Sequence, residues 1–115
     1  MIPSNFEEKY IIGDHEREKD YVFPDSSIIF ITDDITGNSF ANSKNLKGLD
    51  FLTLSNYWDS KEANLEGIQE DGRVWRQKKL EGVTVGYLNV HVLQKEKFDS
   101  IINSLNSERV TRRLN

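Results

Sequence analysis

Two β-rich runs in the last third of the chain show the clearest pattern of apolar and polar positions. Residues 73–80 and 83–92 are separated only by Glu81 and Gly82. A two-residue loop with glycine at its second position is typical of a tight hairpin, because glycine adopts positive φ without steric cost. The pattern therefore predicts an antiparallel hairpin over these two runs.

The position of the loop fixes the expected register of this hairpin. It places Arg76 opposite Tyr87 and Trp75 opposite Leu88. Because successive side chains of a strand point to opposite faces, Trp75, Leu88 and Val90 share one face. We expect this face to meet the core, since Arg76 and a lysine interrupt the other face.

Three further segments carry strand patterns. Residues 27–32 include a continuous apolar run, which predicts a central strand that is covered on both faces. Residues 10–12 are a short candidate strand, and residues 49–54 are another. Residues 33–38 have turn chemistry and predict a second hairpin that returns through residues 39–41.

The helical pattern is clearest in residues 94–106. This segment places four apolar side chains at positions i, i+3, i+4 and i+7, namely Phe98, Ile101, Ile102 and Leu105. We expect this stripe to pack on the sheet face that carries Trp75. Residues 55–66 also have a helical pattern that Gly67 would end, and the charged segment 13–20 is expected to be a loop or a single helical turn.

These elements together predict an α+β fold. The expected architecture is an antiparallel, meander-like sheet of about four to six strands with one or two helices, the C-terminal helix packing on one sheet face. A chain of 115 residues is the size of one domain. Residues 1–9 are expected to be a leader and residues 107–115 a flexible tail.

Composition excludes several classes of site. The chain contains no cysteine, which rules out disulfides, thiolate zinc sites and cysteine nucleophiles. No apolar run approaches the ~20 residues of a membrane-spanning helix, and the N-terminus lacks the basic start of a signal peptide. We therefore expect a soluble, cytoplasmic protein.

Charge is distributed unevenly along the chain, whose net charge is −4. Residues 1–34 contain nine acidic and three basic residues, and residues 35–72 contain six acidic and three basic residues. Residues 73–115 contain nine basic and four acidic residues. The imbalance predicts one acidic and one basic surface, although folding could also interleave the charges into an ordinary mixed surface.

Few residues suggest catalysis. His15 and His91 are the two histidines. A small ribonuclease-like enzyme would need such imidazoles within reach of one phosphate, and His91 is its candidate residue. Because their spacing gives no support for a joint site and a lone histidine defines no geometry, His91 is favoured as an ordinary strand residue.

Acidic clusters are also weak candidates for a site. Asp33 and Asp34 are adjacent and lack the distant bidentate glutamate of a calcium loop. Glu66, Glu70 and Asp71 could supply paired carboxylates, but a glycosidase needs its two carboxylates across a cleft. We expect no metal, no cofactor and no catalytic residue, so the prediction is a protein that is not an enzyme.

A basic strand offers an alternative function. Arg73, Arg76, Lys78 and Lys79 lie in one predicted strand beside aromatic residues, an arrangement that could contact nucleic acid. Such binding depends on neutralising phosphates with a sustained basic face. The acidic remainder of the chain opposes it, so a nucleic-acid-binding accessory protein is the second choice.

In size, charge, hairpin-rich pattern and closing helix, the chain resembles the small immunity proteins of bacterial contact-dependent growth inhibition and related polymorphic toxin systems. The resemblance implies a cytoplasmic inhibitor that binds a cognate toxin domain, often a basic nuclease, and blocks its active site or substrate surface. These families have no common motif, so the resemblance transfers no functional residue.

Acidic side chains of the first third are the natural contacts for a basic protein partner, because charge complementarity speeds and directs association. Two aromatic residues are candidate anchors, as aromatic residues are enriched at interface hot spots. The predicted partner-binding residues are Glu16, Glu18, Asp20, Asp25, Asp33, Asp34, Tyr57 and Trp58.

Overall fold

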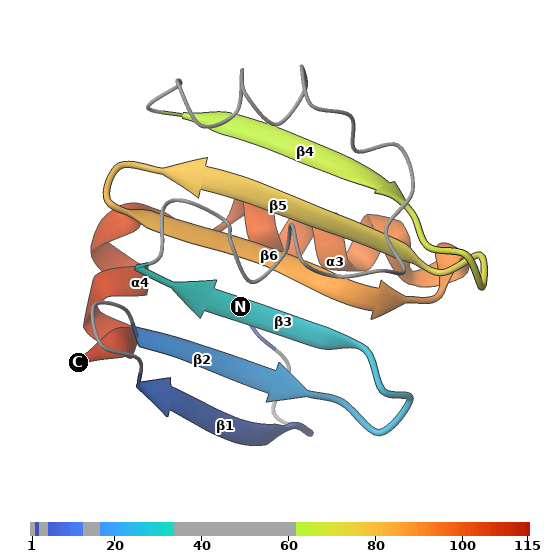
Figure 1. Cartoon of the computed structure of the whole chain (residues 1–115), viewed down its shortest axis with the longest axis horizontal. Coiled ribbons are helices and arrows are strands. Elements are labelled where there is room, and N and C mark those ends of the chain that lie inside the picture. Colours follow the sequence, from blue (N-terminus) through green and yellow to red (C-terminus); the bar gives the residue numbers. More distant parts are fainter. Residues whose placement is uncertain (1, 3–4, 13–16, 34–61) are drawn as a thin grey trace.

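The structure is a computed structural model that describes residues 2, 5–12, 17–33 and 62–115. Six strands form one antiparallel sheet in the order β1-β2-β3-β6-β5-β4 (Figure 1). The strands are β1 Glu7–Ile12, β2 Arg17–Val22, β3 Ile28–Thr32, β4 Ala63–Ile68, β5 Val74–Leu80 and β6 Val83–Val90. The sheet is thus two three-stranded meanders joined through the β3–β6 pairing, and the predicted α+β class is confirmed.

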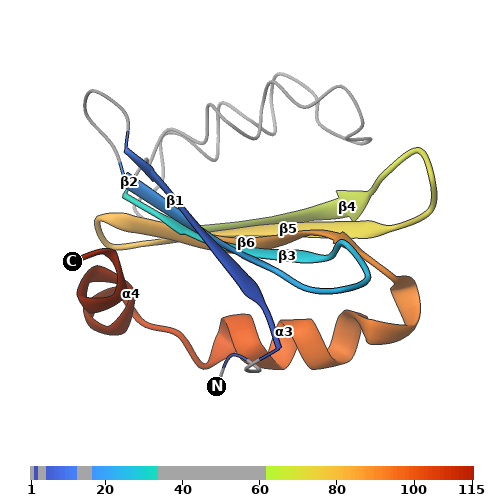
Figure 2. The same cartoon turned by 90° about the horizontal axis from the view of Figure 1, so that it is seen from below.

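Both long helices pack on one face of the sheet (Figure 2). They follow β6 in the order η1 Val92–Gln94, α3 Lys95–Asn103 and α4 Ser107–Leu114. The segment predicted as a helix over 94–106 therefore contains α3 and ends before α4. No helix among the described residues is long and apolar enough to span a membrane.

The predicted β5–β6 hairpin is confirmed from its loop up to the Arg76–Tyr87 pair. Gly82 adopts a φ of +76°, as the tight turn requires. Beyond Arg76 the register shifts, so that Val74 lies opposite Val90. This irregularity is a β-bulge, which the expected register did not contain.

Trp75 is buried as predicted, but the prediction that the C-terminal helix packs on its face is wrong. Val90, expected on the same face, belongs to the cluster under the helix, beyond the register shift in β5. Val85 and Tyr87 belong to the cluster that packs against Phe98 of α3, whereas Trp75 packs with Phe30 on the opposite face. The basic residues that interrupt the helix-facing side do not prevent packing, because long side chains can lie along a helix with their charged ends paired. The polar cluster beneath α3, described below, shows how Arg76 does so.

Two further predictions about the described residues are wrong. The charged segment 13–20 was expected to be irregular, but its second half begins strand β2. The end of the helix predicted over 55–66 lies in strand β4, and Gly67 is inside that strand rather than at a helix end. Half-buried and exposed residues alternate along β4 with the two-residue period of a strand, and β4 is the last strand of the sheet. Residues 34–61, with the predicted turn, return strand and the 49–54 strand, lie outside the described residues.

The two chain ends contribute to the core. Ile2 is buried and Phe6 packs against the main cluster, so the predicted leader is attached to the domain. The predicted flexible tail is instead helix α4, whose Val110 and Leu114 are buried. Asn106 caps this helix by accepting a 2.9 Å hydrogen bond from the backbone N–H of Arg109. The sequence contains two signals for this helix that the prediction of a flexible tail overlooked. Val110 and Leu114 are apolar and four residues apart, and Asn106 is a favourable N-cap residue.

Truncation of α4's apolar face tests this description. We expect Leu114→Ala to lower the free energy of unfolding by about 3 kcal/mol, since Leu114 is only 1% exposed and its truncation leaves a cavity in the core. Arg112→Ala is the matched control, because its ion pair with Glu108 is exposed and is worth about 0.5 kcal/mol. Urea denaturation measures both, and equal stabilities of the two variants would contradict a docked α4.

Candidate functional site: a hollow beside the β2–β3 turn

The predicted partner-binding acids do not form a single patch. Glu18 and Asp20 lie on the face of β2 that points away from the helices, because they alternate with Tyr21 of the main core. Asp25 is in the turn between β2 and β3, and Asp33 follows the far end of β3. Asp20 Oδ1 is buried and accepts no hydrogen bond within the described chain, so that oxygen does not face a partner. The remaining candidates, Glu16, Asp34, Tyr57 and Trp58, lie outside the described residues.

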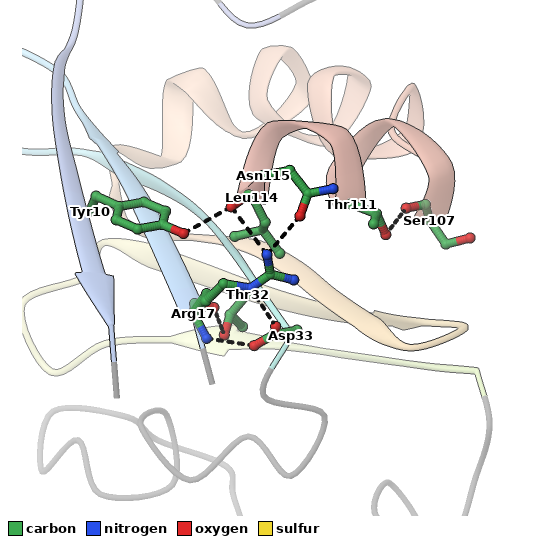
Figure 3. A network of polar contacts seen from close by, with 8 residues as sticks. All are labelled: Tyr10, Arg17, Thr32, Asp33, Ser107, Thr111, Leu114 and Asn115. Atoms are coloured by element: carbon green, nitrogen blue, oxygen red, sulfur yellow. Dashed lines mark hydrogen bonds and ion pairs between the residues drawn. The ribbon is translucent and has the colours of Figure 1, made fainter. Parts of the chain in front are cut away.

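Asp33 is committed to an internal network with Arg17 (Figure 3). Its Oδ1 accepts from the backbone N–H of Arg17 at 2.5 Å, and its Oδ2 accepts from Arg17 Nε at 3.0 Å. The same guanidinium donates to Asn115 Oδ1 at 2.7 Å, and the hydroxyl of Tyr10 donates to the carbonyl of Leu114 at 2.8 Å. These contacts satisfy hydrogen-bonding groups at the C-terminal end of α4 and attach the helix to the first hairpin, which is formed by β1 and β2.

A hollow of about 210 Å³ opens beside the β2–β3 turn. Phe23 after β2 and Phe98 of α3 line its apolar part, and their rings meet edge to face with centroids 5.6 Å apart. Asp25 and Ser27 line it from the turn, and Lys97 lines it from the helix. The turn and the first residues of α3 thus surround an aromatic surface with charged side chains.

Asp25 is held in a fixed position at the edge of this hollow. Its Oδ1 accepts from the hydroxyl of Ser27 at 2.5 Å and from the backbone N–H of Ser27 at 3.0 Å. Arg73 fixes the same turn by donating to the carbonyl of Asp25 at 3.1 Å. The hydrogen bonds from Ser27, with the charge of Arg73, hold the pKa of Asp25 below its usual value. The exposed side chain is therefore an ionised carboxylate whose Oδ2 accepts no hydrogen bond from the described residues.

A second polar cluster, beneath α3, was missed by sequence reasoning. Asp99 Oδ1 accepts from the hydroxyl of Tyr87 at 2.7 Å and from Arg76 Nη1 at 3.1 Å, and its Oδ2 accepts from Lys95 Nζ at 2.6 Å. Arg76 also donates to Asn64 of β4 and Asn103 of α3. The i,i+4 spacing of Lys95 and Asp99 was the available sequence signal. Because its donors and acceptors face one another, this cluster fastens the helix to the sheet.

The cluster beneath α3 predicts a dependence of stability on acid. Burial alone would raise the pKa of Asp99, but hydrogen bonds from Lys95 and Tyr87, with the charges of Lys95 and Arg76, outweigh it and lower the pKa. Because the pKa of Asp99 is lower in the folded than in the unfolded chain, ionised Asp99 stabilises the fold. This stabilisation is complete above the pKa of the unfolded chain, about 4, and is lost as the pH falls below it. Urea midpoints at several pH values should therefore show the gap between the wild type and Asp99→Asn shrinking in acid. A gap that stays constant down to pH ~2 would contradict this.

The residues of the predicted basic strand do not form a sustained basic face. Arg76 and Lys79 are buried, and they point to opposite faces of β5. His91, the candidate of the ribonuclease-like alternative, is exposed and caps η1 by accepting from the backbone N–H of Leu93 at 3.2 Å. Tyr87, the aromatic residue expected opposite Arg76, is fully buried. His15 lies outside the described residues.

Carboxylates of the β4–β5 region also have local partners. Glu66 lies 3.7 Å from Lys95 Nζ, and Asp71 accepts from the backbone N–H of Arg73 at 3.0 Å. Within the described part of the chain, no three His, Asp or Glu side chains are grouped as metal ligands.

Comparison of the chain with protein-family models, curated proteins and solved structures found no match. The hollow beside Asp25 is the candidate site because it joins concavity, aromatic surface and an accessible fixed charge.

Proposed function

We propose that this chain is an inhibitor of the immunity-protein type, which binds a basic toxin domain in the cytoplasm and covers its active site or substrate surface. The observation that carries the proposal is the exposed, ionised carboxylate of Asp25 beside an aromatic hollow. A fixed charge next to an apolar depression is the usual composition of a protein-binding hot spot, where a desolvated anchor is surrounded by polar groups.

Surface charge on the first hairpin supports the same kind of partner. Glu7 and Glu8 of edge strand β1 are exposed, and Glu8 forms an ion pair with Lys19, whose Nζ lies 3.3 Å from its carboxylate. Exposed carboxylates raise the rate at which a basic protein associates, even where they add little to final affinity. The β1–β2 hairpin therefore attracts the basic partner towards this protein, while the hollow at Asp25 provides the specific contact.

Growth rescue tests this function. The proposal predicts that a reading frame next to the gene of this protein encodes the toxin. Its product, expressed alone in bacteria, should arrest growth, and co-expression of this protein should restore it. Asp25→Asn should rescue less well, because the charge is lost while the acceptor for Ser27 is kept. Glu81→Gln is the matched control, since it removes one exposed charge from the β5–β6 turn at the other end of the sheet. Arrest that persists despite abundant folded protein would contradict the proposal.

A further inference from the structure

We propose that the hollow beside Asp25 receives a single apolar side chain of the partner protein, and that Asp25 pairs with a lysine or arginine next to that side chain in the partner's sequence. This inference rests on the proposed function and specifies the chemistry of the contact.

The size of the hollow limits its occupant. Its volume of about 210 Å³ lies below the roughly 300–1,000 Å³ that is typical of pockets for small-molecule ligands and cofactors. A space of this size suits one side chain inserted from a protein surface. Insertion would cover the exposed edges of Phe23 and Phe98, whose rings are otherwise buried in the core. Apolar burial of this kind supplies most of the energy at interface hot spots.

One acidic and one basic side chain, Asp25 and Lys97, border the hollow. The partner residue beside the hollow could therefore be basic, to pair with Asp25, or acidic, to pair with Lys97. Asp25 is fixed by two hydrogen bonds from Ser27, and pairing with it costs little additional ordering. Lys97 is exposed on α3 and has no hydrogen bond or ion pair to another described residue. Its long side chain would lose rotamer entropy on pairing, and lysine is depleted at interfaces. The fixed carboxylate therefore selects a cationic neighbour, while Lys97 can turn towards solvent.

Short peptides test this chemistry without the toxin. The probes are acetyl-Leu-Arg-amide and acetyl-Arg-Leu-amide, and the charge control is acetyl-Leu-Glu-amide. Backbone amide shifts of the full-length protein, followed by NMR during titration, should move saturably at Ser27, Lys97 and Phe98 with a Leu–Arg probe at millimolar concentrations. Acetyl-Gly-Arg-amide, which lacks the apolar side chain, should produce much smaller shifts.

Two substitutions should change the affinity in opposite directions. Asp25→Asn should weaken binding of the Leu–Arg probes about threefold, and Lys97→Glu should strengthen it about threefold, as expected for exposed charge pairs. Both substitutions should have reversed effects on the Leu–Glu control. Absence of saturable shifts at the hollow, or equal affinities of the wild type and Asp25→Asn, would overturn the inference. Growth rescue by a protein that binds none of these peptides would reject this contact and leave the inhibitor function standing.

Discussion

Gly86→Ala should lower the free energy of unfolding by more than about 3 kcal/mol, because a side chain at this position overpacks the centre of the sheet. A Cβ there would lie 2.0 Å from the backbone carbonyl oxygen of Arg76 and 2.5 Å from Cζ of Phe30. The carbonyl belongs to strand β5 and cannot move without disturbing the β5–β6 pairing. Urea denaturation followed by circular dichroism measures the loss, if the variant folds at all.

Gly82→Ala is the control for Gly86→Ala. Gly82 has open space around the position of a Cβ but adopts a φ of +76°. Its substitution should cost only about 1–2 kcal/mol, the usual penalty of a left-handed conformation for a residue with a side chain. If Gly86→Ala were as stable as the wild type, or more stable than Gly82→Ala, the close packing of β3, β6 and β5 would be wrong.

Asp99→Ala should lower the free energy of unfolding by about 3 kcal/mol, since it leaves a buried guanidinium without its carboxylate. The side chain of Arg76 is 10% exposed and that of Asp99 is 23% exposed, so water screens this pair only weakly. The hydroxyl of Tyr87 would lose its acceptor in the same variant. Denaturant midpoints and slopes give the change in stability.

Two variants separate the charge from the packing in this cluster. Lys95 pairs with the same carboxylate but its side chain is 35% exposed, so Lys95→Ala should cost no more than about 0.5 kcal/mol. Replacing both buried partners, as in Arg76→Met with Asp99→Leu, should recover most of the loss from Asp99→Ala. A double variant that is less stable than Asp99→Ala alone would show that the ion pair stabilises the fold more than apolar side chains do in the same place.

Local patterns were sufficient for the elements whose signals lie close together in sequence. The Glu81-Gly82 loop determined the pairing of Arg76 with Tyr87, and that pairing is observed. The apolar run of β3 predicted a central strand, which lies between β2 and β6. The stripe from Phe98 to Leu105 predicted a helix that packs on the sheet, and its first three apolar residues are buried in α3.

Tertiary pairing decided the elements that were predicted wrongly. The bulge beside Val74 moves the far end of β5 out of the simple register, and Arg76 can face the helix only because Asp99 and two asparagines receive it. Strand β2 is rich in charge, so its sequence gave no alternation, yet it is held between β1 and β3. These effects depend on partners distant in sequence, which single-segment patterns do not contain.

The candidate site was only half visible in the sequence. Asp25 was among the predicted partner-binding acids because it belongs to the acidic first third of the chain. Its neighbours in the hollow, Phe98 and Lys97, belong to a helix near the other end of the chain. No spacing rule connects a turn with a distant helix, so the concave aromatic surface required the fold.

Calorimetric titration of this protein with the purified toxin domain that the growth-rescue experiment identifies tests the central claim most directly. The account predicts a one-to-one complex that weakens as salt rises and that Asp25→Asn weakens more than Glu81→Gln does. Absence of a complex, or equal affinities for these two variants, would contradict binding through the carboxylate beside the hollow.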